Sequence, residues 1–205
     1  MNSPDQKIIS NIYEKKEGYK NVYAWFSNLK SKGLNPLNIA MDGERSVIRA
    51  INEIWPQTSI QRCLYHIQQE GMRWLRTYPK TQAGKDLRGL LKTLCRITCF
   101  GERNKFIVAY LDWIEVYKDF VLSLPKNKVA FKDLKRTMAL INNAIPDMFH
   151  YLKDVNIDKT TNKLESYYSR LKADYRKHRG LTQKHKISYL KWYCYFKNEK
   201  NNSTL

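Results

Sequence analysis

The sequence lacks the features that would point to a secreted or membrane protein. It contains no run of about 18 apolar residues, which argues against a membrane-spanning helix. Residues 1–15 are polar and have no apolar stretch of the kind found in a secretory signal. Four cysteines are too few for a disulfide-stabilised scaffold. We therefore expect a soluble intracellular protein with reduced thiols, cytoplasmic, and associated with the nucleoid if the source is bacterial.

Acidic residues are also scarce relative to basic ones. The 205 residues include 37 Lys and Arg against 19 Asp and Glu, a formal net charge of +18. Such an excess favours a polyanionic partner, nucleic acid first and an anionic membrane surface second. Because no membrane span is predicted, we expect a nucleic-acid partner and no membrane partner.

Common catalytic motifs are missing as well. The sequence has no nucleophile elbow, no phosphate-binding glycine loop and no dinucleotide-binding fingerprint. Any chemistry must therefore come from residues that are dispersed along the chain.

The order of predicted elements indicates an α/β fold followed by a long helical region. Predicted strands cover residues 7–13, 37–41 and 59–63. Predicted helices cover residues 19–32, 47–55, much of 67–158, 162–179 and 186–197, the last with a strand as the alternative. Alternating strands and helices at the start imply a parallel sheet with right-handed crossovers.

Asp42 follows the predicted strand 37–41 and precedes a predicted helix. Open α/β sheets bind ligands at the carboxyl ends of their strands. Hard divalent cations such as Mg²⁺ prefer oxygen ligands, so Asp42 is a candidate metal ligand. An Asp in front of a helix is equally suited to be its N-cap. Both interpretations stay open at this point.

Glu165 lies in the first turn of the predicted helix 162–179. Asn162-x-x-Glu165 resembles a capping box. Spacings of three and four residues place a polar and basic stripe on the same helix face, formed by Ser169, Lys172, Arg176 and Arg179. The stripe suits a metal-binding carboxylate beside phosphate-holding cations, or simply a solvated basic face.

Cys63 and His66 form a Cys-x-x-His pair. A structural zinc site needs four ligands, which Cys95 and Cys99 would have to complete from another element. A second interpretation is a buried cysteine beside a hydrogen-bonded histidine. A third places His66 near a scissile phosphate, where it orients groups or handles protons.

Residues 159–200 combine many basic and aromatic side chains. Cations there would neutralise phosphates, and some of the rings could stack on unpaired bases. Several of the aromatic residues fall at helical spacing, which favours the core for most of them.

Together these pieces resemble the catalytic domain of Mutator-type (MULE-like) DDE transposases, in particular its C-terminal part. The resemblance rests on residues 29–34, Met41-Asp42-Gly43 with Ala50-Ile51 and Trp55-Pro56, residues 61–66, residues 161–166, Arg170-Leu171-Lys172 and His178-Arg179-Gly180. It implies a ribonuclease H-like α/β fold with a large all-helical insertion. In this chain that means a partial core in 1–66, an insertion in 67–158, and basic helices in 159–205 that complete the core.

The resemblance also implies a chemistry. Three carboxylates would hold two divalent cations, Mg²⁺ or Mn²⁺, for DNA strand transfer. Asp42 resembles the second carboxylate and Glu165 the third, and both would be metal ligands. Cys63 and His66 match the family's Cys-x-x-His motif near the active site. The expected DNA-binding residues are Lys172, Arg176 and Arg179.

The first carboxylate of the family has no clear counterpart. Asp5 is the only Asp before Asp42, and it precedes the first predicted strand. We therefore expect a transposase fragment that is inactive alone, with DNA, another copy of itself or a missing N-terminal transposase part as partners. The alternatives are a non-catalytic DNA-binding or regulatory protein, or a ribonuclease or RNA-binding protein.

Overall fold

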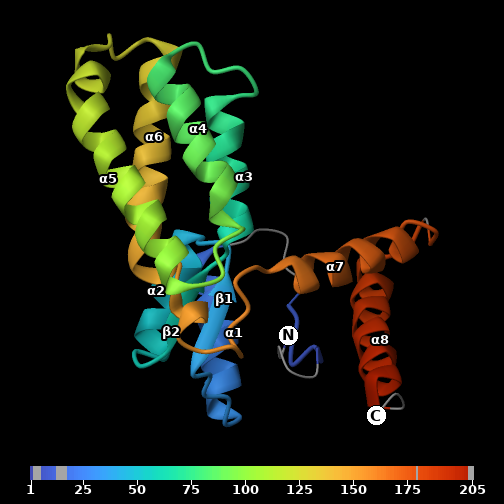
Figure 1. Cartoon of the computed structure of the whole chain (residues 1–205). Helices are drawn as coiled ribbons and strands as arrows, with labels where there is room; N and C mark the ends of the chain where they lie inside the picture. Colours follow the sequence, from blue (N-terminus) through green and yellow to red (C-terminus); the bar gives the residue numbers. More distant parts are fainter. Residues whose placement is uncertain (2–5, 13–17, 179, 203–205) are drawn as a thin grey trace. The chain divides into compact units, whose positions relative to one another are not determined.

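The computed structural model describes residue 1 and residues 6–12, 18–178 and 180–202 (Figure 1). Most of these residues are helical, and they contain one small parallel sheet. The elements are α1 (Tyr19–Ser31), β1 (Asn38–Met41), α2 (Arg45–Ile54), β2 (Ser59–Arg62), α3 (Leu64–Leu75), α4 (Gln82–Leu94), α5 (Phe100–Ser123), α6 (Val129–Ala144), η1 (Ile145–Asp147), η2 (His150–Leu152), α7 (Asn162–Tyr175) and α8 (Gln183–Asn202). This mostly helical structure with a small parallel sheet is compatible with the predicted α/β class with a large helical insertion, and the ribonuclease H-like fold stays a prediction.

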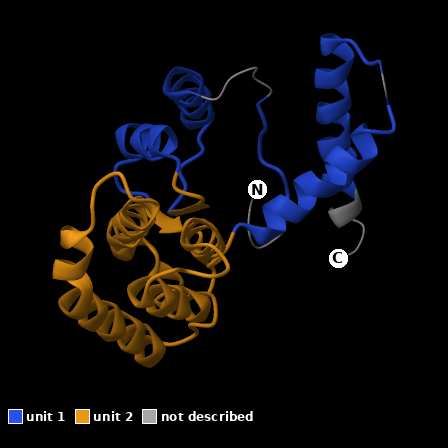
Figure 2. Ribbon diagram, turned by 90° about the horizontal axis from the view of Figure 1, so that it is seen from above, with its two compact units in different colours: residues 1–37, 44–58, 161–205 blue, residues 38–43, 59–160 orange. Residues whose placement is uncertain are grey.

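The chain forms two compact units, each built from separate segments (Figure 2). Unit 1 comprises residues 1–37, 44–58 and 161–205, and unit 2 comprises residues 38–43 and 59–160. Both strands therefore belong to the unit that contains α3–α6. The domain limits at 66/67 and 158/159 derive from sequence pattern and stay a prediction.

The sheet of unit 2 consists of β1 and β2 in parallel, with Asn38 opposite Ser59 and Met41 opposite Arg62. The Cys63 backbone N–H donates to the Met41 carbonyl at 2.7 Å and extends the ladder by one bond. Two of the three predicted strands are thereby confirmed to within one residue. Because the strands are parallel, both end at the same edge of the sheet.

The helices α3–α6 hold most of the buried apolar side chains of unit 2. One cluster includes Leu87, Leu91 and Ile141, and a second includes Leu64 and Leu94, all fully buried. The helices predicted within residues 67–158 are therefore confirmed, and these apolar side chains face a core. Gly71 permits close packing of α3 on α4, because a Cβ at that position would lie 2.5 Å from Leu91 Cδ1.

In unit 1, helices α1 and α2 pack on each other. The rings of Phe26 and Trp55 lie 5.2 Å apart between centroids. The Trp55 indole N–H donates to the Leu34 carbonyl at 3.0 Å, which satisfies its polar group. The helix predicted over residues 19–32 ends at Ser31 with Lys32 as its C-cap, and Gly33, the predicted stop, follows at φ +91°.

The strand predicted at 7–13 is wrong for residues 7–12, and Tyr13 lies outside the described residues. The Ile8 N–H donates to Asn198 Oδ1 at 2.9 Å, and Asn198 Nδ2 donates to the Ile8 carbonyl at 2.9 Å. A side chain of α8 thus satisfies this backbone in place of a neighbouring strand.

Two helices near the end of the chain differ from their predicted limits. Helix α7 ends at Tyr175, well before the predicted end at residue 179. Helix α8 covers residues 183–202, so the strand considered for residues 186–197 is wrong. Between them, Gly180 has φ +83°, a conformation that L-residues rarely adopt.

Candidate functional site

The carboxyl edge of the sheet in unit 2 brings together several predicted site residues. Asp42 follows β1 and is exposed to solvent. Arg62 is the last residue of β2, and Cys63 comes directly after it. Parallel pairing places these ends side by side, at the edge where open α/β sheets bind ligands.

Arg62 is a functional candidate that sequence reasoning missed. Its side chain is buried, with 7% of the residue exposed. Burial lowers the pKa of the guanidinium, and the neighbouring charges of Asp147 and Asp42 oppose that shift. Arg stays protonated in proteins, so the residue is a buried cation beside Asp42. Its Nη2 makes a long hydrogen bond to the Asp42 carbonyl, at 3.4 Å.

The Nε atom of Arg62 has no hydrogen-bond partner in the described part of the chain. A buried donor without a partner costs free energy. The signal in the sequence was an Arg at the end of a strand, next to the Cys-x-x-His pair.

Gly43 is required by this arrangement. Its φ is +101°, and a Cβ there would lie 2.1 Å from the Arg62 Cζ. Both the backbone conformation and the space taken by the guanidinium favour glycine. The Asp42-Gly43 pair is therefore structurally linked to Arg62.

Asp42 does not cap helix α2. The N-cap is Glu44, whose carboxylate accepts a hydrogen bond from the Ser46 N–H at 3.3 Å. The capping interpretation of Asp42 is thus wrong, since two residues of turn intervene before the helix. Its interpretation as a metal ligand stays a proposal.

Cys63 and His66 lie at the start of α3. Cys63 is the N-cap residue, is fully buried, and makes no side-chain cap hydrogen bond. His66 is partly buried one turn later, with its ring edge-on to Tyr65 at 6.3 Å between centroids. The α3 backbone therefore fixes the direction of both side chains at the sheet edge.

The four-ligand zinc site that Cys95 and Cys99 would complete is not supported. Cys95 ends α4 and Cys99 precedes α5. Burial raises the pKa of the Cys95 thiol, with a further contribution from Cys63. Within the described ranges, Cys95 and Cys99 join Cys63 and His66 in no metal-type cluster, and none of the four cysteines forms a disulfide.

Gln61 connects the sheet edge with the segment around η1 and η2 through side-chain hydrogen bonds. It is fully buried. Its Nε2 donates to the Arg62 carbonyl at 2.8 Å and the Met148 carbonyl at 3.0 Å, and its Oε1 accepts from the Tyr151 N–H at 3.1 Å. The first bond lies within β2. The other two connect β2 with Met148, directly after η1, and with Tyr151 of η2.

Glu165 belongs to unit 1 and lies in the first turn of α7, partly buried. The helix N-cap is Thr161, and the Glu165 carboxylate accepts from the Thr161 hydroxyl at 2.7 Å. Asn162 is the first residue of the helix and not its N-cap, so the capping box predicted from Asn162 is wrong. A carboxylate at a helix N-terminus is favoured by the helix dipole.

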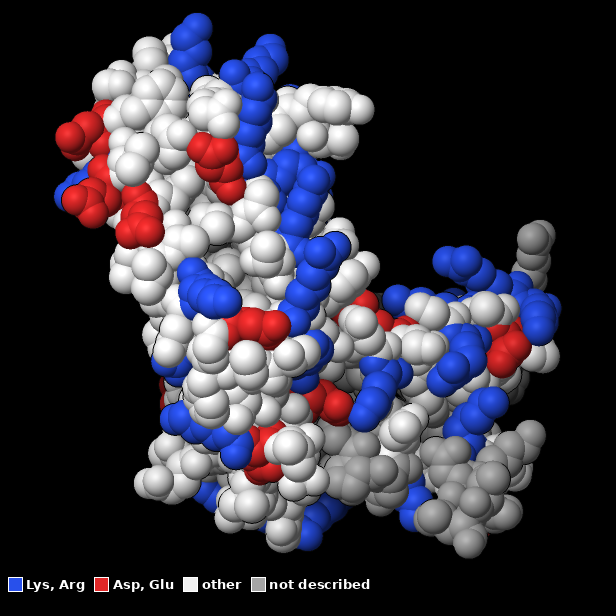
Figure 3. Space-filling model, viewed as in Figure 1, with Lys and Arg blue, Asp and Glu red and all other residues white. Residues whose placement is uncertain are grey.

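Two predicted DNA-binding residues, Lys172 and Arg176, are exposed on α7 and at its C-cap. Arg179 lies outside the described residues. Figure 3 shows basic side chains along α7 with few acidic ones between them. An acidic exception is Asp174, which accepts a hydrogen bond from Lys177 Nζ at 3.0 Å.

Comparison with protein families decides the origin of the chain. Residues 3–191 match the family model described as transposase, Mutator family. The chain belongs to the Mutator family of transposases. The resemblance predicted from the sequence is thereby confirmed. No curated protein and no solved structure matches this Mutator-family chain significantly.

Family membership has two consequences. It connects this Mutator-family chain with DNA transposition and implies an interaction with DNA. The described helices also include none that is long and apolar enough to cross a membrane.

Proposed function

We propose that the chain is part of a transposase catalytic domain that carries out divalent-metal-dependent phosphodiester strand transfer on DNA. The observation that supports this proposal most strongly is the family match over residues 3–191, which includes Asp42, Glu165 and the Cys63/His66 pair. The position of Asp42 directly after a parallel strand agrees with it.

Asp42 and Glu165 have the chemistry that the metal requires. Transposases of this family are generally metal-dependent. Carboxylate oxygens are the preferred protein ligands of Mg²⁺ and Mn²⁺, and Asp42 is exposed to solvent. Bound ions would stabilise the negative charge that develops at the phosphate and at the leaving oxygen.

Other residues would handle the substrate. In the reaction, the oxygen of water or of a DNA 3′-hydroxyl bonds to phosphorus. The bond from phosphorus to the leaving ester oxygen breaks, and that oxygen ends up with a proton. We assign to His66 the orientation or transfer of protons at this step. Lys172 and Arg176 would neutralise flanking phosphates.

We expect these 205 residues to be inactive by themselves. Two of the three carboxylates of the family have counterparts here, Asp42 and Glu165, and Asp5 lies outside the described residues. Purified protein should neither cleave nor join element-end DNA in Mg²⁺ or Mn²⁺. Metal-dependent cleavage by the isolated chain would overturn this expectation.

Metal binding gives the residue-level test. Asp42→Asn and Glu165→Gln should each weaken Mn²⁺ binding by about tenfold or more, measured by titration calorimetry. Matched controls are Asp112→Asn and Glu115→Gln, since both acids lie on α5 and are exposed. Normal Mn²⁺ binding in both test variants, with lowered thermal stability, would assign the two acids a structural role.

A second candidate function is a non-catalytic DNA-binding or regulatory protein derived from a transposase. The exposed Lys172 and Arg176 favour it, because binding of phosphates to cations needs no metal. This function predicts DNA binding in the presence of EDTA that Asp42→Asn leaves unchanged. Specific transfer activity restored by a complementing transposase segment would favour the first function instead.

A further inference from the structure

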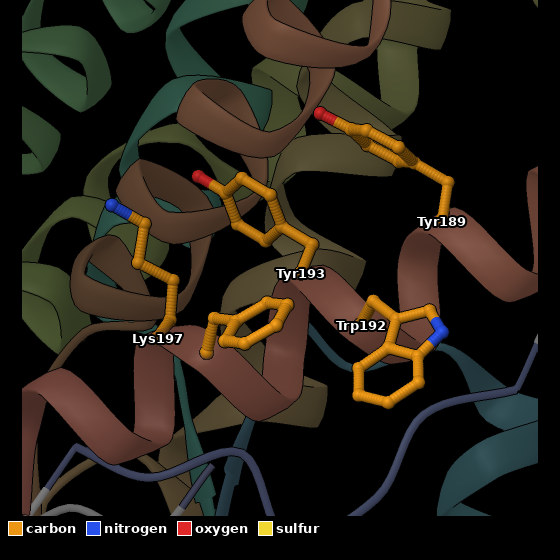
Figure 4. Close-up of a pocket in the computed structure, with 5 residues that line it drawn as sticks. Tyr189, Trp192, Tyr193 and Lys197 are labelled. Atoms are coloured by element: carbon orange, nitrogen blue, oxygen red, sulfur yellow. The ribbon is translucent and has the colours of Figure 1, made fainter.

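Helix α8 carries an aromatic face that the strand-transfer proposal does not use. Its members are Tyr189, Trp192, Tyr193, Phe196 and Lys197, spaced by three and four residues and therefore on one side of the helix. They line a shallow hollow of about 270 Å³ (Figure 4). The hollow is open and lies just below the roughly 300–1,000 Å³ of small-molecule sites, so an enclosed cofactor is a poor fit.

Two rings of this face, those of Tyr189 and Tyr193, pack against tyrosine side chains of α7. Tyr193 lies edge-on to Tyr167 at 5.9 Å between centroids, and Tyr189 lies edge-on to Tyr175 at 5.8 Å. The Tyr193 hydroxyl also makes a long hydrogen bond to Asp174, at 3.4 Å. These contacts fix one side of the aromatic face and give it a defined shape.

The outer rings are open to solvent. Trp192 is 59% exposed and Phe196 is 57% exposed. The two rings stack on each other at 5.6 Å between centroids, with 23° between their planes. Large aromatic side chains exposed together indicate a contact surface more than a core.

The charges near these rings indicate which kind of partner the aromatic face can bind. Lys197 Nζ lies 5.6 Å from the centre of the Tyr193 ring. A second copy of this chain would bring its own net charge of +18 against that face, which is repulsive. Rings beside cations instead suit a polyanion whose own flat groups are accessible.

We propose that the α8 aromatic face binds unpaired bases of single-stranded DNA. Bases would stack on Trp192 and Phe196, while Lys197 contacts the phosphates. A duplex buries the flat faces of its bases by stacking them on one another, so it offers little to these rings. The choice of DNA as the polymer rests on the function proposed above, and the stacking itself does not.

The test compares oligonucleotides at about 0.1 M salt, because cation–phosphate binding depends strongly on salt. Fluorescein-labelled oligo(dT), a blunt duplex of equal length and oligo(U) RNA are titrated with the full chain in EDTA. We expect tighter binding to oligo(dT) than to the duplex, with quenching of tryptophan fluorescence. Trp192→Ala should weaken oligo(dT) binding by about tenfold or more and leave duplex binding nearly unchanged.

Two further variants guard the interpretation. Trp192→Phe keeps a ring and should retain most of the oligo(dT) affinity. Tyr78→Ala removes an aromatic side chain that is 86% exposed in unit 2 and should have no effect. Circular dichroism and thermal melting of each variant verify the fold, which an exposed Trp192 should not influence.

Several results would overturn the proposal. The first is equal affinity of the chain for the duplex and for oligo(dT). The second is oligo(dT) affinity that the Trp192→Ala substitution leaves unchanged. The third is tighter binding of oligo(U) than of oligo(dT). A dimer in sedimentation that Trp192→Ala converts to monomer would assign the face to a second copy instead. The Mn²⁺ titration of Asp42→Asn tests strand transfer separately, so either proposal can fail while the other holds.

Discussion

Helices α3–α6 of unit 2 and helices α7–α8 of unit 1 use aromatic residues in opposite ways. In the first region Phe106, Tyr110 and Trp113 are nearly fully buried. In the second, Trp192 and Phe196 are more than half exposed. Similar residue types at similar helical spacing therefore build a core in one region and a surface in the other.

Two of the buried rings in unit 2 have polar groups that are satisfied by nearby acceptors. The Trp113 indole donates to the Ala83 carbonyl at 2.9 Å, and the Tyr110 hydroxyl donates to Asn142 Oδ1 at 2.8 Å. Burial raises the pKa of Tyr110 well above its ordinary value, so it stays a neutral donor. Rings with satisfied polar groups can be buried without penalty.

By contrast, few residues of the α7–α8 region are buried. Its apolar cluster consists of Ile8, Tyr167 and Cys194. Stability should thus depend mainly on α3–α6, whereas α7–α8 can display side chains for contact with partners.

The largest effect is expected in the core of unit 2. Leu91→Ala should destabilise the protein by about 2–5 kcal/mol, because it leaves a cavity between α3 and α4. Phe196→Ala on α8 should change stability by about 0.5 kcal/mol or less, since the ring is exposed. Urea unfolding followed by circular dichroism measures both, and equal losses would break the contrast.

The next effect concerns the bonds that hold the sheet edge. Gln61→Leu should cost about 1–3 kcal/mol, because the Tyr151 N–H and the Met148 carbonyl lose their buried partner. Gln82→Leu, which removes a hydrogen bond to Asp86 at the surface, is the matched control. A similar cost for both variants would show that the buried position of Gln61 is unimportant.

Two glycines separate backbone strain from side-chain crowding. Gly33→Ala adds a methyl group that has no other atom within 4 Å. Only the positive φ of residue 33 therefore opposes the substitution, which should lower the free energy of unfolding by about 1–2 kcal/mol. Gly43→Ala has the same strain and also displaces the Arg62 guanidinium, so it should cost more. Arg62→Ala combined with Gly43→Ala should remove that excess in a double-mutant cycle. Equal losses of unfolding free energy in Gly33→Ala and Gly43→Ala would argue against crowding of the Arg62 guanidinium at position 43.

The smallest effect is expected at the surface of α7–α8. The hydrogen bond from Lys177 lowers the pKa of Asp174 below its ordinary value of 3.8. A lowered folded-state pKa stabilises the protein above the unfolded pKa, and this stabilisation is lost as the pH falls through the folded value. Asp174→Asn should therefore slightly reduce the acid sensitivity of unfolding below about pH 4. Unchanged acid unfolding of the variant would show that this ion pair contributes nothing.

The sequence by itself determined the local structure and the family of this protein. Periodicity placed the strands before Asp42 and Cys63, and the ordered motifs identified the Mutator resemblance. These features depend on residues close together in the chain, where period and turn chemistry act directly.

Only the tertiary structure decided which residues support the site. Gln61 donates a hydrogen bond to the Met148 carbonyl, 87 positions away in the chain. The Arg62 guanidinium occupies the space that a side chain at Gly43 would need. The sequence pattern likewise did not predict three further features. These are the N-cap at Glu44, the hydrogen bond between Thr161 and Glu165, and the exposure of Trp192. Burial and hydrogen bonding between distant segments depend on how the helices pack, and a one-dimensional pattern does not contain that information.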